Sequence, residues 1–294
     1  MTAASPAGFR RIAVLGTGLI GGSFGLAVCK QLPEARIVGW DKEPVLRKAE
    51  AAGAIHEGSV DLDRVVAGAD LVYLALPVGL TLELLPKVAA TAEPQALVTD
   101  ACSTKRAVCQ AAAKHFEGSG VRFLGGHPMA GKETPGVEHA DAELFRDSKY
   151  VLIGEDENSS RTDPRVSHFV ALLESLGARP VWLDAETHDW AAAIVSHLPQ
   201  LVSVALAGVV HEEIDETGLP VTLSGRGLRD LLRLAGSPYS IWRDIALTNT
   251  DNISRALDRV AQAVEHLRAR LASRELEDEF AAANELYKFL QDLQ

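Results

Sequence analysis

His127 lies in a short segment of small and rigid residues that surrounds one titratable ring. Residues 125–131 are Gly-Gly-His-Pro-Met-Ala-Gly. The glycines and the proline hold the backbone and leave the ring few local packing partners. Since a histidine can take up a proton near neutral pH, this setting favours a general base. We therefore predict that His127 is a catalytic proton acceptor, and a structural histidine in a tight turn is the alternative.

A second polar cluster, at residues 100–105, follows the predicted end of another strand and contains Ser103 and Thr104. A hydroxyl at such a position can cap the next helix, which is the role we predict for Thr104. For Ser103 we predict contact with the ring of His127 or with a hydroxyl group of the substrate, and a helix cap is the alternative.

Polar residues also interrupt an apolar helical segment, where residues 196–200 read Ser-His-Leu-Pro-Gln. His197 and Gln200 are three positions apart and share a helix face, so both can point into one cleft. We predict that Ser196, His197 and Gln200 bind substrate, with a satisfied core histidine as the alternative for His197. Arg229 opens a later helix, and we expect its planar guanidinium to bind a substrate carboxylate.

The segment 16–21 is a G-x-G-x-x-G motif between a predicted strand and a predicted helix. Its first glycine allows the tight turn, the second lets the backbone approach a pyrophosphate, and the third lets helix and strand pack closely. The helix N-terminus then offers free N–H groups to the diphosphate. The predicted cofactor-binding residues of this turn are Gly16, Thr17, Gly18, Leu19, Ile20 and Gly21.

Asp41 ends the second predicted strand, 20 positions beyond Gly21. A carboxylate there accepts hydrogen bonds from the ribose hydroxyls and repels a 2′-phosphate, which favours NAD over NADP. Lys42 follows and could weaken that repulsion. We predict NAD as the cofactor and NADP as the less favoured one.

The elements that must position these groups alternate between strands and helices. The apolar runs predict strands at 12–15, 36–40, 71–76, 96–99, 122–124, 149–153 and 179–183, with helices between them. This order predicts an α/β fold with a doubly wound, mostly parallel sheet of the Rossmann type. Ligands bind at the carboxyl ends of such strands, which adds Leu76 and Pro77 to the predicted cofactor residues.

Beyond residue 184 the pattern predicts helices only, at about 185–213, 226–235, 238–248, 250–272 and 275–291. We therefore expect two domains, a cofactor-binding domain at 1–183 and an all-α domain at 184–294.

The charge balance and the cysteines limit the classes of protein to which this chain can belong. Twenty-nine Lys and Arg residues against 40 Asp and Glu residues give a net charge of −11, which argues against nucleic-acid binding. The three cysteines, Cys29, Cys102 and Cys109, form no C-x-x-C pair, so a reducing compartment and a cytoplasmic protein are expected. The Cys and His spacing does not suggest a metal site.

Two apolar segments could be mistaken for targeting or membrane elements. Arg10 and Arg11 precede an apolar run that resembles a signal peptide, but its five glycines fit the nucleotide motif better. Residues 191–210 carry no formal charge and are long enough to cross a bilayer. Because this stretch contains polar residues and has acidic flanks, we predict a helix buried inside a soluble protein or dimer, and no membrane.

Taken together in chain order, these motifs resemble the prephenate/arogenate dehydrogenases of tyrosine biosynthesis. The resemblance rests on 16–21 with Asp41, 100–105, 126–131 with Glu133, 196–199, 227–235 and 241–245. It implies a Rossmann domain, and a helical domain that forms the core of a homodimer. It also implies oxidation of the ring alcohol of prephenate or arogenate by hydride transfer to NAD(P)+, with loss of the ring carboxylate as CO2.

The resemblance also implies roles for individual residues. His127 matches the proton acceptor, Ser103 a serine that orients the hydroxyl, and Arg229 an arginine that binds a substrate carboxylate. His197 and Glu133 match further active-site positions.

Gln200 departs from the family pattern, because many members have a second histidine there. The preference between the keto acid prephenate and the amino acid arogenate therefore stays open. Another Rossmann-plus-helical dehydrogenase and an NAD(H)-sensing regulator are the remaining alternatives.

Overall fold

The computed structural model describes residues 8–132, 134–154, 162–214 and 216–292. Its centre is a six-stranded sheet with the order β3-β2-β1-β4-β5-β6, in which every neighbouring pair is parallel. The strands are β1 (Arg11–Leu15), β2 (Arg36–Trp40), β3 (Glu57–Ser59), β4 (Leu71–Leu74), β5 (Leu97–Asp100) and β6 (Arg122–Leu124). The strand order reverses between β1 and β4, which is the place where such sheets bind ligands. The doubly wound sheet is therefore confirmed.

Helices cover both faces of this sheet, and each face has its own apolar core. One core joins α1 (Leu19–Gln31) and α7 (Pro164–Ser175) to the sheet, and the other joins α3 (Leu62–Val66), α4 (Val78–Thr91) and α5 (Arg106–Phe116). The short α2 (Glu43–Ala51) follows β2. Because both faces are covered, the central strands are apolar without alternation, and β4 is buried along its whole length.

The last three strands do not extend the parallel sheet, and this part of the prediction was wrong. β7 (Gly126–Pro128), β8 (Lys149–Ile153) and β9 (Arg179–Leu183) form a separate three-stranded sheet in which β7 and β8 are antiparallel. Only Gly125 separates β6 from β7. A parallel neighbour requires a crossover of a dozen or more residues, so the chain turns out of the first sheet at this point.

Beyond β9 the described chain is helical. The elements are α8 (Ala185–Ala192), η3 (Ala193–His197), α9 (Leu198–Glu212), α10 (Leu219–Thr222), α11 (Arg226–Leu232), η4 (Leu234–Gly236), α12 (Tyr239–Thr248), α13 (Thr250–Arg270) and α14 (Leu276–Asp292). The first three make one continuous run in which η3 is a π-helical turn. Pro199 follows this turn and has no N–H to donate to the preceding turn, which favours a local change of helix geometry there.

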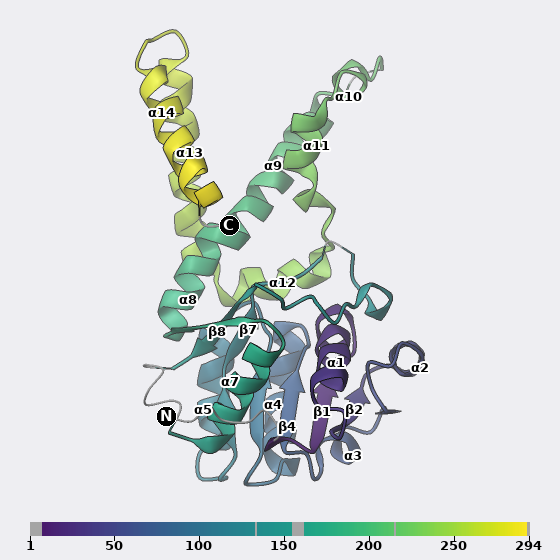
Figure 1. Cartoon of the computed structure of the whole chain (residues 1–294). Coiled ribbons are helices and arrows are strands. Elements are labelled where there is room, and N and C mark those ends of the chain that lie inside the picture. Colours follow the sequence, from purple (N-terminus) through teal and green to yellow (C-terminus); the bar gives the residue numbers. More distant parts are fainter. Residues whose placement is uncertain (1–7, 133, 155–161, 215, 293–294) are drawn as a thin grey trace.

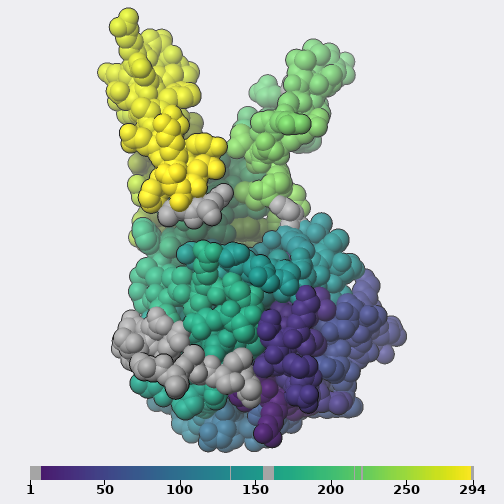
Figure 2. Space-filling model, viewed as in Figure 1, coloured from purple at the N-terminus to yellow at the C-terminus, as the bar shows by residue number. Residues whose placement is uncertain are grey.

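The helical part forms two arms that diverge above the sheet (Figure 1). One arm consists of α9 with α10 and α11, and the other consists of α13 with α14. At their base α12 lies across the carboxyl edge of the sheet, where the Asp244 carboxylate accepts a 2.9 Å hydrogen bond from the backbone N–H of Gly79. The space-filling view shows open space between the arms (Figure 2).

The run Ala185–Glu212 is long and apolar enough to cross a membrane by length and composition. Much of α9 is exposed in the single chain, including Val202, Val204 and Val209. Of the two predicted settings for this helix, burial inside the single chain is found only for its first part, and burial inside a dimer stays a prediction.

A buried ion pair fixes the strand ends below α12. The Lys105 ammonium lies against the Asp100 carboxylate, and both side chains are fully buried. The Lys105 ammonium also donates to the carbonyl of Gly126 at 2.6 Å. Burial alone would lower the pKa of Lys105, but the Asp100 charge, the neighbouring Cys102 and Cys109, and the hydrogen bond to Asp100 together hold this pKa above its usual value. The pair thus joins the end of β5 to the start of β7, one residue before His127.

Candidate functional site

His127 lies on β7 and is buried, with 9% of the residue exposed. Its Nδ1 is 2.9 Å from Nε2 of His188 on α8, and the two rings meet edge to face. The helical part of the chain thus holds the ring predicted to be the proton acceptor. Burial, and then the neighbouring His188, Lys105 and His197, keep the pKa of His127 well below its usual range. The ring is therefore neutral at neutral pH and able to accept a proton.

The contact continues from His188 to the carboxylate of Asp189. Nδ1 of His188 lies 2.8 Å from Oδ1 of Asp189, which is fully buried. The same carboxylate accepts the backbone N–H groups of Lys105 at 2.7 Å and Arg106 at 3.0 Å. Burial alone would raise the pKa of Asp189, but the hydrogen bonds from His188, Arg106 and Lys105 lower it overall. Asp189 is therefore ionised.

Asp189 also corrects the prediction for Thr104. No side chain of its own segment caps α5, whose N-cap residue is Lys105. The hydroxyl of Thr104 instead lies 2.7 Å from that of Thr248 on α12. The carboxylate of Asp189 accepts the N–H groups at the start of α5, so the cap comes from a different part of the chain.

His197 ends the π-helical turn and is 1% exposed. Its Nδ1 lies 3.3 Å from the amide nitrogen of Asn249, and its ring meets Trp242 edge to face at 5.9 Å. Its Nε2 is buried without a hydrogen-bond partner. Burial lowers the pKa of His197 to about 4, although the Asp189 charge opposes this shift. A buried polar nitrogen without a partner is costly, and a ligand would satisfy it.

Among the described residues, no hydrogen bond joins Gln200 to His197. The Gln200 amide nitrogen donates to the carbonyl of Leu234 at 2.8 Å, so it ties α9 to η4. Ser196 is half-buried on the π-helical turn. His197 and Gln200 therefore bind different partners, although they were predicted to share a helix face.

Ser103 lines a cavity of about 190 Å³ at the carboxyl ends of β4 and β5. Across residues 8–132 and the other described ranges, no hydrogen bond joins it to His127. The cavity walls combine the nucleotide turn, the strand ends and α12, through Ile20, Ala75, Leu76, Pro77, Val78, Ala101, Cys102, Ser103, Ile241 and Ile245. Leu76 and Pro77 thus lie beside Ser103 in the wall of this cavity.

The nucleotide turn has the shape that a dinucleotide needs. Gly16 has a φ of +89°, and a Cβ there would lie 2.4 Å from the carbonyl oxygen of Ala75. A Cβ on Gly21 would meet the carbonyl oxygen of Gly16 at 1.9 Å, so helix and strand pack too closely for any side chain. A Cβ on Gly18 would meet nothing within 4 Å. The turn therefore leaves space at Gly18, where the motif places the pyrophosphate.

The Asp41 carboxylate is held in place beside this turn. It accepts the backbone N–H of Thr17 at 2.8 Å and that of Lys42 at 2.7 Å. These bonds connect the end of β2 to the turn after β1. Asp41 is thus fixed where the ribose hydroxyls of a bound dinucleotide would lie.

Arg229 is not part of this cluster. Arg229 is exposed on α11, which packs against α9 and η4 in the upper arm. Glu133 lies outside the described residues.

Sequence reasoning missed His188, Asp189 and Asn249. The adjacent His188 and Asp189 were a signal that could have been used, since such a pair can orient a third group. Asn249 carried no comparable signal, because it falls between two predicted helices.

Comparison with known proteins agrees with this geometry. Residues 24–182 match the family model for the prephenate dehydrogenase nucleotide-binding domain, and residues 184–289 match that for the prephenate dehydrogenase dimerization domain. The chain is 35% identical over 273 residues to a prephenate dehydrogenase of Lactococcus lactis, covering 87% of this chain and 74% of the relative.

Solved structures give the same result. A prephenate dehydrogenase from A. aeolicus, in complex with hydroxyphenyl propionate and NAD+, superposes with a TM-score of 0.86 at 27% identity, covering 96% of this chain and 98% of that one. An arogenate dehydrogenase from Synechocystis gives 0.76 at 28% identity, covering 96% and 100%. The two family models, this relative and these structures show that the chain belongs to the prephenate dehydrogenase family.

Proposed function

We propose that this chain catalyses the NAD-dependent oxidative decarboxylation of prephenate to 4-hydroxyphenylpyruvate. The observation that carries the proposal is the position of His127. This neutral, buried histidine lies at the carboxyl edge of a dinucleotide-binding sheet, and a second histidine and a carboxylate hold it there. A regulator that only senses NAD(H) has no need of such a base.

The chemistry follows from the groups present. His127 accepts the proton of the ring hydroxyl as the alcohol is oxidised. NAD+, when bound, would supply the acceptor for the hydride that leaves the ring carbon bearing this hydroxyl. Loss of CO2 then makes the ring aromatic, which drives the reaction without further help from the protein. Ser103 orients the hydroxyl from the wall of the cavity, and the buried Nε2 of His197 meets a polar group of the substrate.

The residues of the turn fit the cofactor. Gly16, Gly18 and the start of α1 would hold the pyrophosphate, and Asp41 would hold the ribose. The cavity beside Leu76 and Pro77 would hold the reactive end of the cofactor. Because the Asp41 charge disfavours a 2′-phosphate, NAD is the proposed partner and NADP the weaker one.

Arogenate is the second candidate substrate, since one of the structural relatives is an arogenate dehydrogenase. The two compounds differ in their side chain, which is a keto acid in one and an amino acid in the other. Gln200 supplies a neutral amide rather than a charge near the helical wall, and its nitrogen is already bonded to Leu234. This arrangement gives no charge-based preference for the amino acid, so prephenate is placed first.

We further propose that two copies of the chain form a dimer through the two arms. Both arms expose large apolar side chains, and one of the matching family models describes a dimerization domain. The exposed residues include Val202, Val204, Val209 and Leu231 on one arm, and Val264, Leu267, Phe280, Leu286, Tyr287, Phe289 and Leu290 on the other. Apolar surface of this extent is typical of an interface between subunits.

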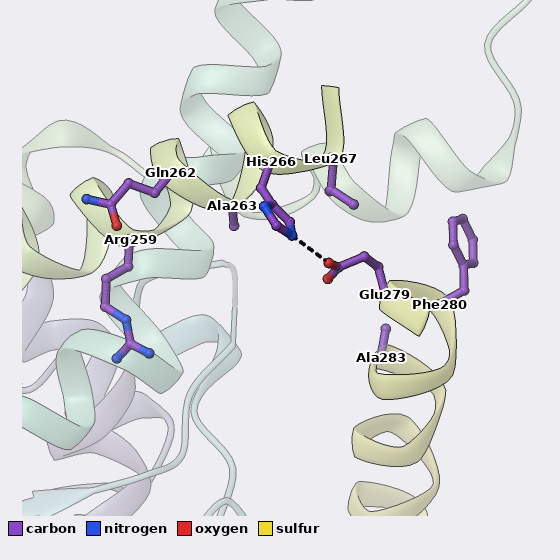
Figure 3. Close-up of a pocket in the computed structure, with 8 residues that line it drawn as sticks. All are labelled: Arg259, Gln262, Ala263, His266, Leu267, Glu279, Phe280 and Ala283. Carbon is purple, nitrogen blue, oxygen red and sulfur yellow. Dashed lines mark hydrogen bonds and ion pairs between the residues drawn. The ribbon is translucent and has the colours of Figure 1, made fainter. Parts of the chain in front are cut away.

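The groove between α13 and α14 belongs to this surface. Figure 3 shows its walls, with Ala263 and Leu267 from α13 facing Phe280 and Ala283 from α14, and with His266 bonded to Glu279 at 2.9 Å. None of the predicted site residues lines it. We assign it to packing against a second copy.

In the proposed dimer, Arg229 of one chain can reach the substrate site of the other chain. In one chain, α11 lies high on an arm that leads away from the sheet (Figure 1). The arm of a second copy, seated between the two arms, would point its α11 toward the edge where α12 and His127 lie. We therefore propose that Arg229 binds a substrate carboxylate in the partner's site. In this arrangement residues 1–183 bind the cofactor, and residues 184–294 supply substrate contacts and the dimer core.

A cytoplasmic location is part of the proposal. It is supported by the three cysteines, which are free thiols in the structure. The thiol of Cys102 is buried and lies 3.3 Å from the hydroxyl of Thr81, as part of the packing beside the cavity.

The first experiment supplies prephenate or arogenate with NAD+ and follows NADH absorbance. We expect turnover with prephenate. The His127→Asn variant should lose about 10²- to 10⁴-fold in kcat, the contribution typical of a general base, with little change in the KM for NAD+. The control is His115→Asn, which alters a half-buried histidine near the end of α5. Absence of turnover with both substrates would reject the proposed function, and full kcat in His127→Asn would reject the assigned base.

A second experiment tests the cofactor preference. Replacing Asp41 with Ala removes the charge that opposes a 2′-phosphate, so the ratio of kcat/KM for NAD+ to that for NADP+ should fall by at least about 10-fold. The control is Asp63→Ala, on the exposed surface of α3. An unchanged ratio would show that Asp41 does not select the cofactor.

A third experiment mixes two inactive variants. If Arg229 serves the partner's site, a mixed dimer of His127→Asn and Arg229→Ala chains has one site with both residues intact. Unfolding and refolding the mixture should therefore restore activity that neither variant has alone. Activity no higher than the sum of the two separate variants would place Arg229 in its own subunit's site or outside any site.

A further inference from the structure

The orientation of the Asn249 side-chain amide is fixed by its neighbours. Its oxygen accepts from the guanidinium of Arg106 at 3.1 Å and from the amide nitrogen of Asn252 at 2.9 Å. The reverse orientation would set an NH2 group against both of these donors. The nitrogen of Asn249 must therefore be the atom that faces the backbone carbonyl of Asp189, at 2.7 Å, and Nδ1 of His197, at 3.3 Å.

This orientation determines the tautomer of His197. Because the Asn249 nitrogen is a donor, Nδ1 of His197 must accept and carries the lone pair. The neutral imidazole has only one ring proton, which therefore lies on Nε2. Nε2 is the nitrogen that is buried without a partner, so His197 presents an unused N–H donor.

The same reasoning gives His127 the opposite tautomer. An ionised carboxylate only accepts, so Nδ1 of His188 carries the proton that Asp189 binds. Because the ring proton of His188 is on Nδ1, its Nε2 has the lone pair and accepts from Nδ1 of His127. His127 is left with an unprotonated Nε2, to which no described residue donates a hydrogen bond.

We propose that Asp189, through its carboxylate and its backbone carbonyl, sets opposite tautomers in the two histidines of the site. His127 presents a lone pair on Nε2, and His197 presents an N–H on Nε2. Resting on the proposed function, this assigns them separate tasks: His127 takes the hydroxyl proton, and His197 donates a hydrogen bond to an oxygen of the dicarboxylate substrate. His188 and Asn249 act as positioning residues.

The charges around the two rings are consistent with neutral imidazoles. His127 faces His188, Lys105 and His197, all of which disfavour a further positive charge. For His197, burial and His188 oppose protonation and only Asp189 favours it. Burial has the largest effect on both pKa values, and both are lowered.

The direct test is nitrogen NMR of the full-length protein labelled with ¹⁵N-histidine, without substrate, at pH 8. Spectra of His127→Asn and His197→Asn assign the two rings. We expect a pyridine-like Nε2 in His127 and a pyrrole-like Nε2 in His197. The same tautomer in both rings, or the reverse assignment, would overturn the proposal. Since this readout does not depend on turnover, it stays valid even if the proposed substrate is wrong.

A pair of variants tests the positioning role of His188. In His188→Gln, the amide oxygen can accept from His127 while the amide nitrogen donates to Asp189, which keeps the polarity of the chain of bonds. In His188→Phe, neither bond can form. We expect kcat to fall about 100-fold in the Phe variant and less than about 10-fold in the Gln variant, with the KM for NAD+ unchanged in both. Equal kcat values in the two variants would contradict the positioning role.

Discussion

The carboxylate of Asp189 is the point at which the two parts of the molecule depend on each other. It comes from the helical part, yet it accepts the N–H groups that open α5 on the sheet, together with Nδ1 of His188. The partial positive charge of a helix N-terminus stabilises an anion there. Transferring a carboxylate from water into the protein interior costs several kcal/mol, and the hydrogen-bond donors around Asp189 offset that cost. The helical part is thereby fixed at the edge where the strands end.

Neighbouring charges strengthen this junction. Lys105 contributes its backbone to Asp189 and its side chain to the buried Asp100, so a single residue connects the capped helix to β5 and β7. Arg106 donates to Asp189, to Asn249 and to Asp251 at the start of α13. Rigid placement of this kind is what a proton transfer needs, since small errors in the position of a base reduce the rate strongly. The junction thus couples the stability of the fold to the chemistry of the site.

Sequence reasoning predicted the parts whose signals are local. The glycine turn, the position of Asp41 and the central strands follow from short-range patterns, and so do the helices after residue 184. The antiparallel β7 was missed because its three residues, Gly-His-Pro, have no apolar strand pattern, and one glycine alone separates it from β6. The cap at Thr104 was wrong because a carboxylate 83 and 84 positions along the chain from the two N–H groups takes that role. His188 and Asn249 were missed for the same reason, since their partners are set by how the two parts dock. The roles of His127, Ser103 and Arg229 stay predictions.

The measurement that tests this account most directly is the Asp189→Asn variant, examined for both stability and kcat. An asparagine puts an NH2 group against one of the backbone N–H groups that Asp189 now accepts, so it cannot satisfy all the donors. We predict a free energy of unfolding lower by about 3 kcal/mol or more in urea titrations, together with a kcat reduced by about 100-fold or more. A variant as stable and as active as the parent chain would show that neither the docking of the helical part nor the setting of the histidines depends on this carboxylate.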